Sequence, residues 1–173
     1  YTKKIDGVKI YLKTLDKKNA TQEYCDWLND SIVNKYLETR QATVSDLKKY
    51  ITEKFEAGNC LFFGIFWKED GKHIGNIKLE PIDFIGKKAT LGILIGDKNF
   101  WGKGIGTETV NLITEYAFND LWLDEVNLGV ISENKPAIKL YEKCGFKIFK
   151  TDKGCIRYNG FLYDQIWMKR VQN

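Results

Sequence analysis

Three glycines occupy every second position of the segment NFWGKGIGTET (99–109). They are Gly102, Gly104 and Gly106, and Lys103 lies between the first two. The segment follows the apolar run LGILIG, and apolar residues then recur at helical spacing. Glycine lets main-chain N–H groups approach a ligand closely, and a helix N-terminus carries about half a positive charge. A glycine-rich turn between a strand and a helix therefore predicts an anion site, with phosphate as the natural occupant.

Several interpretations of this loop compete. A Rossmann fingerprint needs G-x-G-x-x-G after the first strand of a parallel unit, but Thr107 stands where the third glycine belongs and the preceding strands look antiparallel. A P-loop needs a lysine followed by Ser or Thr, and Gly104 follows Lys103. A cradle for the pyrophosphate of coenzyme A and a turn without any ligand both stay open.

Composition restricts the class of protein. With 173 residues and 43% hydrophobic content, we expect one domain over residues 1–173. There is no long uncharged apolar run and no apolar stretch in YTKKIDGVKI, so we expect a cytoplasmic protein without a membrane partner. The net charge of +4 is spread among interleaved acids and lysines, which does not predict nucleic-acid binding. One histidine and no Cys-x-x-Cys pair leave little for a zinc site, and we expect no metal.

The apolar pattern predicts elements in the order β-α-α-β-β-β-α-β-α-β-β. The predicted strands cover 8–15, 60–67, 73–82, 89–96, 126–131, 146–150 and 161–170, and the predicted helices cover 21–30, 43–55, the stretch from the glycines to Leu121, and 135–145. Asp-Gly in the turn 69–72 favours a hairpin. The long helix between two strands predicts a parallel crossover. The sequence thus predicts an α/β (α+β) fold with one mixed, mostly antiparallel sheet flanked by helices.

Two motifs resemble those of the GNAT superfamily of acyl-CoA-dependent N-acyltransferases. WGKGIGTE matches the first signature, Gln/Arg-x-x-Gly-x-Gly/Ala, at Gly104 and Gly106, with Trp101 in place of Gln or Arg. ENKPAIKLYEKCGFK matches every position of the second signature, which are Asn134, Ala137, Tyr141, Lys143, Gly145 and Phe146. Together with WLND and YLETR, Trp-Gly-Lys-Gly is similar to the branch with ribosomal-protein N-terminal and amino-sugar acetyltransferases. The resemblance implies the GNAT fold and direct acetyl transfer from acetyl-CoA to a primary amine in a ternary complex.

The resemblance also implies roles for individual residues. The family's tyrosine at the position of Tyr141 lies beside the sulfur of CoA, so Tyr141 is the predicted acid for the departing thiolate. The asparagine at the position of Asn134 bonds the cofactor or its neighbour, and the strand before the glycines pairs through its main chain with the pantetheine arm. The predicted cofactor site comprises Ile93, Leu94, Ile95, Trp101, Gly102, Lys103, Gly104, Ile105, Gly106, Thr107, Asn134, Ala137, Tyr141 and Lys143.

The general base is predicted from weaker signals. Relatives often carry an acidic residue where Thr90 stands, so direct proton abstraction there is in doubt. Glu80, on the preceding strand, is the candidate base and would act through water; a surface carboxylate at a strand end is the alternative. His73 follows the hairpin turn, and we expect it to be exposed and not catalytic.

The acceptor site is predicted from charge and from the resemblance. Glu38 and Arg40 lie in the turn that the resemblance places at the acceptor's entrance, although solvated charges would need no function. Asn76 and Lys78 could reach hydroxyls or phosphate if they face the cleft. These residues and the net positive charge favour a nucleotide-linked amino sugar over a protein N-terminus, a polyamine or an aminoglycoside. A non-catalytic CoA-binding regulatory module is the alternative of another class, and a homodimer is possible.

Overall fold

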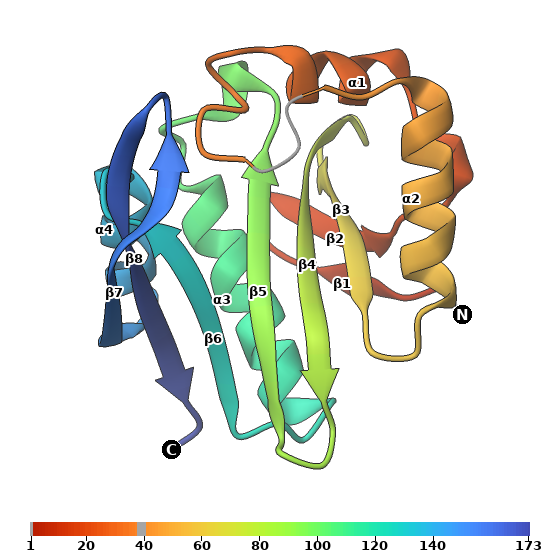
Figure 1. Ribbon diagram of the computed structural model, residues 1–173. Helices are drawn as coiled ribbons and strands as arrows, with labels where there is room; N and C mark the ends of the chain where they lie inside the picture. Colours follow the sequence, from red (N-terminus) through yellow and green to blue (C-terminus); the bar gives the residue numbers. More distant parts are fainter. Residues whose placement is uncertain (1, 38–40) are drawn as a thin grey trace.

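The computed structural model describes residues 2–37 and 41–173 (Figure 1). These residues form one mixed sheet with the strand order β1-β2-β3-β4-β5-β6-β8-β7. The strands are β1 Lys4–Asp6, β2 Ile10–Thr14, β3 Leu61–Trp67, β4 His73–Asp83, β5 Lys88–Ile95, β6 Glu125–Ile131, β7 Lys147–Tyr158 and β8 Phe161–Val171. The α-helices are α1 Gln22–Asn29, α2 Val44–Glu56, α3 Ile105–Asn119 and α4 Lys135–Lys143, and short 3-10 turns cover Lys17–Asn19 and Lys98–Phe100. Within the described ranges, no helix is long and apolar enough to cross a membrane.

The predicted order of elements is confirmed, with two differences at the ends of the chain. The sequence did not predict β1, a strand of 3 residues that pairs antiparallel with β2. The last hairpin is longer than predicted, because β7 runs for 12 residues and continues past 150 into a segment that is mostly exposed. Main-chain pairing with β8 forms this part of β7, which the side-chain pattern of the segment does not predict.

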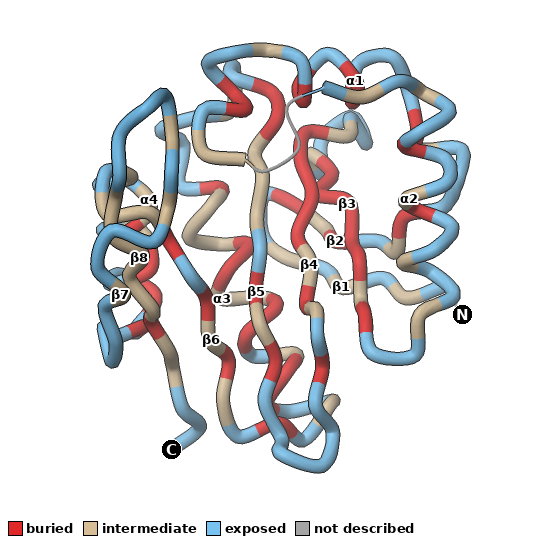
Figure 2. Tube along the Cα trace, viewed as in Figure 1, coloured by how far each residue is buried: buried red, intermediate tan, exposed pale blue. Residues whose placement is uncertain are grey.

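Helices cover both faces of the sheet and create two cores. Strand alternation sends Phe63 toward the core under α3 and Phe62 toward the core under α1 and α2. Threonine caps begin both helices of the second core, because Thr21 accepts from the N–H of Tyr24 and Thr43 accepts from that of Asp46. Figure 2 shows the buried residues concentrated in β3 and β4, between these two layers, while the β7–β8 hairpin is mostly exposed.

The sheet opens between β5 and β6. These two strands run parallel, as the predicted crossover requires, but they pair at only three positions, which end at Thr90↔Asn127. The Thr90 hydroxyl donates to Oδ1 of Asn127 at 2.7 Å there. β5 continues to Ile95 and β6 to Ile131, while β6 keeps its pairing with β8 to the end. Figure 1 shows the two strands adjacent at one end and well separated at the other.

A bulge in β4 changes the surroundings of His73. Gly75 pairs with Ile65 while His73 pairs with the next residue, Phe66, so β4 contains one extra residue at this point. The imidazole stacks on Phe66 at 5.0 Å between ring centroids and touches the rings of Tyr24 and Trp27 at 6.0 and 5.1 Å. The expectation of an exposed His73 is therefore wrong, because the bulge turns this side chain under α1, where it is only partly accessible.

Candidate functional site

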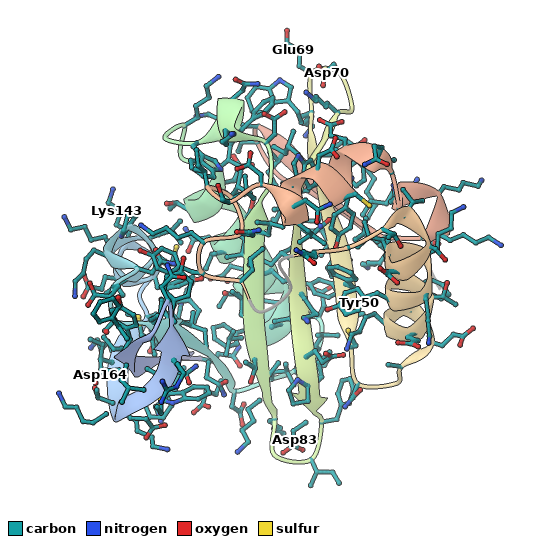
Figure 3. All side chains as sticks on the ribbon, turned by 45° about the horizontal axis from the view of Figure 1, so that its top comes forward. Tyr50, Glu69, Asp70, Asp83, Lys143 and Asp164 are labelled. Carbon is teal, nitrogen blue, oxygen red and sulfur yellow. The ribbon has the colours of Figure 1, made fainter. Side chains whose placement is uncertain are left out.

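A cleft of about 570 Å³ lies where the sheet opens. One wall is residues 91–94 of β5 and another is residues 129–131 of β6. Tyr141 and Asn134 line it from α4 and its N-terminus, and Tyr50 lines it from α2. Figure 3 shows Tyr50 between α2 and the sheet. The opening between the strands thus brings together residues from distant parts of the chain.

Tyr141 is a buried ionisable group in the cleft wall. Its side chain is 8% exposed. Burial, with a smaller contribution from Cys144, raises the pKa of Tyr141 from 10.0 to about 12. The phenol therefore keeps its proton across the neutral range and is able to donate it.

The second motif builds α4. Asn134 is the N-cap, and its Oδ1 accepts from the N–H of Ala137 at 3.4 Å. Gly145, just after the helix, has φ +85°, which suits glycine at that position. Ala137 packs against the main core and Lys143 is exposed, and neither belongs to the cleft wall. Figure 3 shows Lys143 at the outer side of α4. These two residues of α4, predicted for the cofactor, thus lie outside the cleft wall, as do the predicted residues Ile95 and 101–107.

The glycine loop leads directly into α3. Gly102 and Gly104 have φ of 73° and 76°, and an added Cβ would meet nothing within 4 Å at either position. Gly104 is the N-cap of α3, whose first turn has no side-chain cap, in contrast to α1, α2 and α4. Gly106 has a different explanation, because its Cβ would lie 2.5 Å from Leu140 of α4. The loop therefore presents an uncapped helix N-terminus behind open main chain, and Gly106 permits close helix packing.

The end of β5 is partly occupied by the same loop. The N–H of Gly96 donates to Ile74 in β4 at 2.9 Å, so the peptide groups of Ile93 and Ile95 point to the opposite side, toward the opening. The indole N–H of Trp101 already donates to the main-chain oxygen of Ile95 at 2.8 Å. The main chain of Leu94 faces β4, and only its side chain reaches the cleft. Ile93 therefore offers the main-chain edge with both groups toward the opening.

Glu80 is paired with lysines and lies outside the cleft wall. Its carboxylate accepts from Lys54 at 2.6 and 2.8 Å and lies 3.7 Å from Lys78. Burial opposes ionisation, but hydrogen bonds from Lys54 and Cys60 and the nearby ammonium charges outweigh it and lower the pKa of Glu80. It is half-buried and is not part of the cleft wall. A paired carboxylate outside the cleft is poorly placed for a base, and its predicted role stays a prediction.

The two predicted acceptor residues on β4 both line the cleft. Lys78 donates to the Tyr50 hydroxyl at 2.9 Å. Asn76 is 4% exposed, and its Oδ1 lies 2.8 Å from Nε2 of His73. The predictions for Glu38 and Arg40 fall outside the described residues. The sequence missed Tyr50 because its helical spacing matched an ordinary buried face, and it missed His73 because a bulge has no simple sequence signal.

The family follows from a comparison with known domains. The acetyltransferase (GNAT) domain model matches residues 9–147, most of the chain. The chain belongs to the GNAT acetyltransferase family. The predicted family, enzyme class and fold are thereby confirmed for this GNAT chain.

Two curated relatives carry related names. Probable N-acetyltransferase YjcK of Bacillus subtilis is 34% identical over 126 residues, which cover 70% of this chain and 69% of the relative. Acetyltransferase PseH of Campylobacter jejuni is 27% identical over 130 residues, with 73% and 76% of the two chains covered.

Solved structures support the same fold. Spermidine N-acetyltransferase from Vibrio cholerae, in complex with CoA and spermine, has a TM-score of 0.87 at 24% identity, over 95% of this chain and 96% of that one. Microcin C7 self immunity acetyltransferase MccE, in complex with acetyl-CoA and AMP, has a TM-score of 0.81 at 26% identity, over 95% and 93%.

Proposed function

We propose that this GNAT chain transfers an acetyl group from acetyl-CoA directly to the primary amine of an amino sugar, and that the preferred amino sugar is linked to a nucleotide. One observation carries the transferase assignment: the sheet opens beyond Thr90 and Asn127 into a cleft whose wall includes a buried, protonated Tyr141. The cleft thus combines a free strand edge with a proton donor.

The residues of the glycine loop fit the pyrophosphate of CoA. Open main chain at Gly102 and Gly104 stands before α3, whose first N–H groups have no side-chain cap. Such N–H groups and the helix dipole together attract a phosphate. Ile93, with its main-chain groups toward the opening, would pair with the amide-bearing arm. MccE, whose structure contains acetyl-CoA, supports the same cofactor here.

The chemistry needs few groups from the protein. Bound acetyl-CoA supplies the acyl group as a thioester, which an unprotonated amine attacks. Tyr141, which keeps its proton across the neutral range, would donate it to the departing thiolate, and the proton that the attacking nitrogen loses would pass to solvent, from which the phenol is restored. Among the described residues of the cleft wall, Asp46 is the only carboxylate. It already accepts a hydrogen bond from the N–H of Thr43 at 3.0 Å.

The character of the cleft wall favours the sugar acceptor. Among the described residues that line it, the charged side chains are Lys78 and Asp46, one of each sign. A polyamine with several positive charges would be bound best by several carboxylates. An acceptor that carries phosphates instead gains from Lys78, and the AMP bound to MccE supports a nucleotide near this site. The spermine complex of the Vibrio cholerae enzyme is the reason to test polyamines beside the sugars.

The test is a thiol-release assay with acetyl-CoA and a panel of amines. The panel contains 3-amino and 4-amino nucleotide sugars, aminoglycosides, polyamines and peptides that start with Ala or Ser, and mass spectrometry identifies each acetylated product. We expect release with the nucleotide sugars. Acetylation of polyamines or peptides alone would reject the sugar assignment. Binding of CoA without release for any amine would favour the regulatory module.

A further inference from the structure

Asn76 is a buried amide with half of its hydrogen-bonding capacity unused. Its oxygen is bound to His73, while its Nδ2 has no hydrogen-bond partner among the described residues. The side chain is 96% buried and belongs to the cleft wall. A buried donor without a partner is unfavourable, so a ligand atom that accepts from it would bind with an advantage.

The bulge in β4 creates this arrangement. Residues three apart in a regular strand point to opposite faces of the sheet. The extra residue between His73 and Asn76 shifts that alternation by one, and both side chains reach the face under α1 and α2. The 2.8 Å contact between them therefore depends on the bulge.

The aromatic surroundings define what His73 can do. Rings of Tyr24, Trp27 and Phe66 surround the imidazole. Burial lowers the pKa of His73 below 6.5, so the ring is neutral at neutral pH and carries one N–H. The oxygen of Asn76 can only accept, so its 2.8 Å contact with Nε2 is a hydrogen bond when the proton lies on that nitrogen. The three neighbouring rings restrict the orientation of the imidazole.

We propose that His73 is a positioning residue that holds the Asn76 amide with its N–H2 group toward the acceptor substrate, where it recognises an oxygen atom. The proposal rests on the proposed acetyl transfer and deepens it by naming a chemical requirement. The acceptor carries a hydroxyl, carbonyl or phosphate oxygen within reach of Asn76 when its amine is at the thioester.

This requirement separates two classes of amine. A substrate that packs against Asn76 supplies the missing hydrogen-bond acceptor only if it carries one. An amino sugar has several oxygens that can do so. A polyamine has none, and the lone pair of its reacting nitrogen is directed at the thioester. Asn76 therefore selects against oxygen-free amines.

The experiment compares two sets of primary amines with the wild type and four variants. A nucleotide-linked 4-amino sugar, glucosamine and an Ala-starting peptide carry oxygen, and spermidine and cyclohexylamine do not. Asn76→Leu removes the donor. His73→Phe keeps an aromatic ring without an N–H, whereas His73→Gln can still donate to the amide oxygen. Thr114→Val is the matched control, because it removes an equally buried hydroxyl without a partner, in α3 away from the cleft.

We expect Asn76→Leu and His73→Phe to raise the acceptor KM for the oxygen-bearing substrates by roughly tenfold, which corresponds to about 1.4 kcal/mol. The KM for acetyl-CoA and the rates with oxygen-free amines should hardly change, and His73→Gln should restore much of the loss. Thr114→Val should behave as wild type.

Four results would overturn the proposal. A wild type that acetylates only spermidine or cyclohexylamine would reject the oxygen requirement while acetyl transfer stands. Equal losses of kcat/KM for both sets, or no rescue by His73→Gln, would give His73 a merely structural role. No acetylation of any amine would reject the proposed function and this inference together. Acetylation of the peptide alone, with the expected losses in the variants, would support the inference and reject only the assignment of an amino sugar as the acceptor.

Discussion

The indole N–H of Trp101 donates to the main-chain oxygen of Ile95, the last residue of β5, at 2.8 Å. The glycine loop is thereby tied to the strand whose edge faces the cleft. Trp101 itself is 44% exposed, so it contributes more to the position of the loop than to the core. The two parts of the predicted cofactor site are thus coupled by one hydrogen bond.

Trp101→Phe should weaken CoA binding without unfolding the protein. Loss of one neutral hydrogen bond is worth about 1 kcal/mol, or roughly fivefold in the dissociation constant. Calorimetric titration with CoA measures the affinity, and urea unfolding measures stability. Unchanged affinity would show that the loop holds its position without the indole.

Gly104→Val should reduce the affinity for CoA by at least about tenfold, because a branched side chain would stand before the first N–H groups of α3. Gly160→Val is the matched control: Gly160 has φ +79°, an added Cβ there meets nothing within 4 Å, and it lies in the β7–β8 turn. Backbone strain should lower the stability of both variants similarly, by about 1–3 kcal/mol. If both variants bind CoA equally well, the pyrophosphate lies elsewhere.

Tyr141→Phe should lower kcat by roughly a hundredfold to ten-thousandfold while CoA affinity stays close to wild type. The pKa of Tyr141, raised to about 12, adds a pH signature. The phenol stays protonated at pH 10.0, the ordinary pKa of tyrosine, so no loss of rate near pH 10 should come from this group. A rate profile measured where chemistry is limiting checks both points. Wild-type turnover in the variant would remove Tyr141 from the mechanism.

The stability of the fold should depend on pH through His73, the one histidine of the chain. Its folded pKa is below 6.5, so at lower pH the unfolded chain binds a proton that the folded chain does not. The contribution is complete above pH 6.5 and is lost as the pH falls toward the folded pKa. The urea midpoint should therefore drop between about pH 7.5 and about pH 5.5, and His73→Gln should remove most of that drop. An equal drop in the variant would exclude His73 as its source.

Glu108→Gln should destabilise the protein by about 1.5 kcal/mol, because hydrogen bonds to a charged acceptor are stronger than neutral ones. The Glu108 carboxylate, on α3, accepts from the main-chain N–H groups of Lys9 and Ile10 at 3.0–3.1 Å and so ties the β1–β2 hairpin to that helix. Glu115→Gln, at an ion pair with Arg170 on the exposed side of the same helix, should cost much less. Equal losses in urea unfolding would contradict this assignment.

Features encoded by neighbouring residues were predictable. The helices predicted over 21–30 and 43–55 are found there with Thr21 and Thr43 as N-caps, and α4 lies within the predicted segment and is followed by Gly145, because caps depend on residues a few positions apart. The glycine loop was predicted for the same reason. The family resemblance supplied the placement of Tyr141, since helical spacing alone describes an ordinary core residue.

Features that depend on long-range contacts were not predictable. Lys54, 26 residues before Glu80, forms the ion pair that occupies the proposed base. Leu140 explains Gly106 only once α3 and α4 are packed together. The bulge that turns His73 under α1 results from the pairing register of two strands, and periodicity in a single strand does not contain it.

The short ladder between β5 and β6 divides the sheet mechanically. On one side β1 to β5 form a continuous plate, and on the other β6, β8 and β7 form a second, while α3 packs against β2, β5 and β6 and so spans the seam. This ladder has three paired positions, against seven between β4 and β5 and seven between β6 and β8, so of the three it offers the fewest hydrogen bonds against a twist between the two halves. A rotation of β1–β5 relative to β6, β8 and β7 would change the width of the cleft between β5 and β6 and would leave the other strand pairings unchanged. A ligand that contacts both β5 and β6 would oppose this rotation, and the rotation would become easier when the ligand leaves.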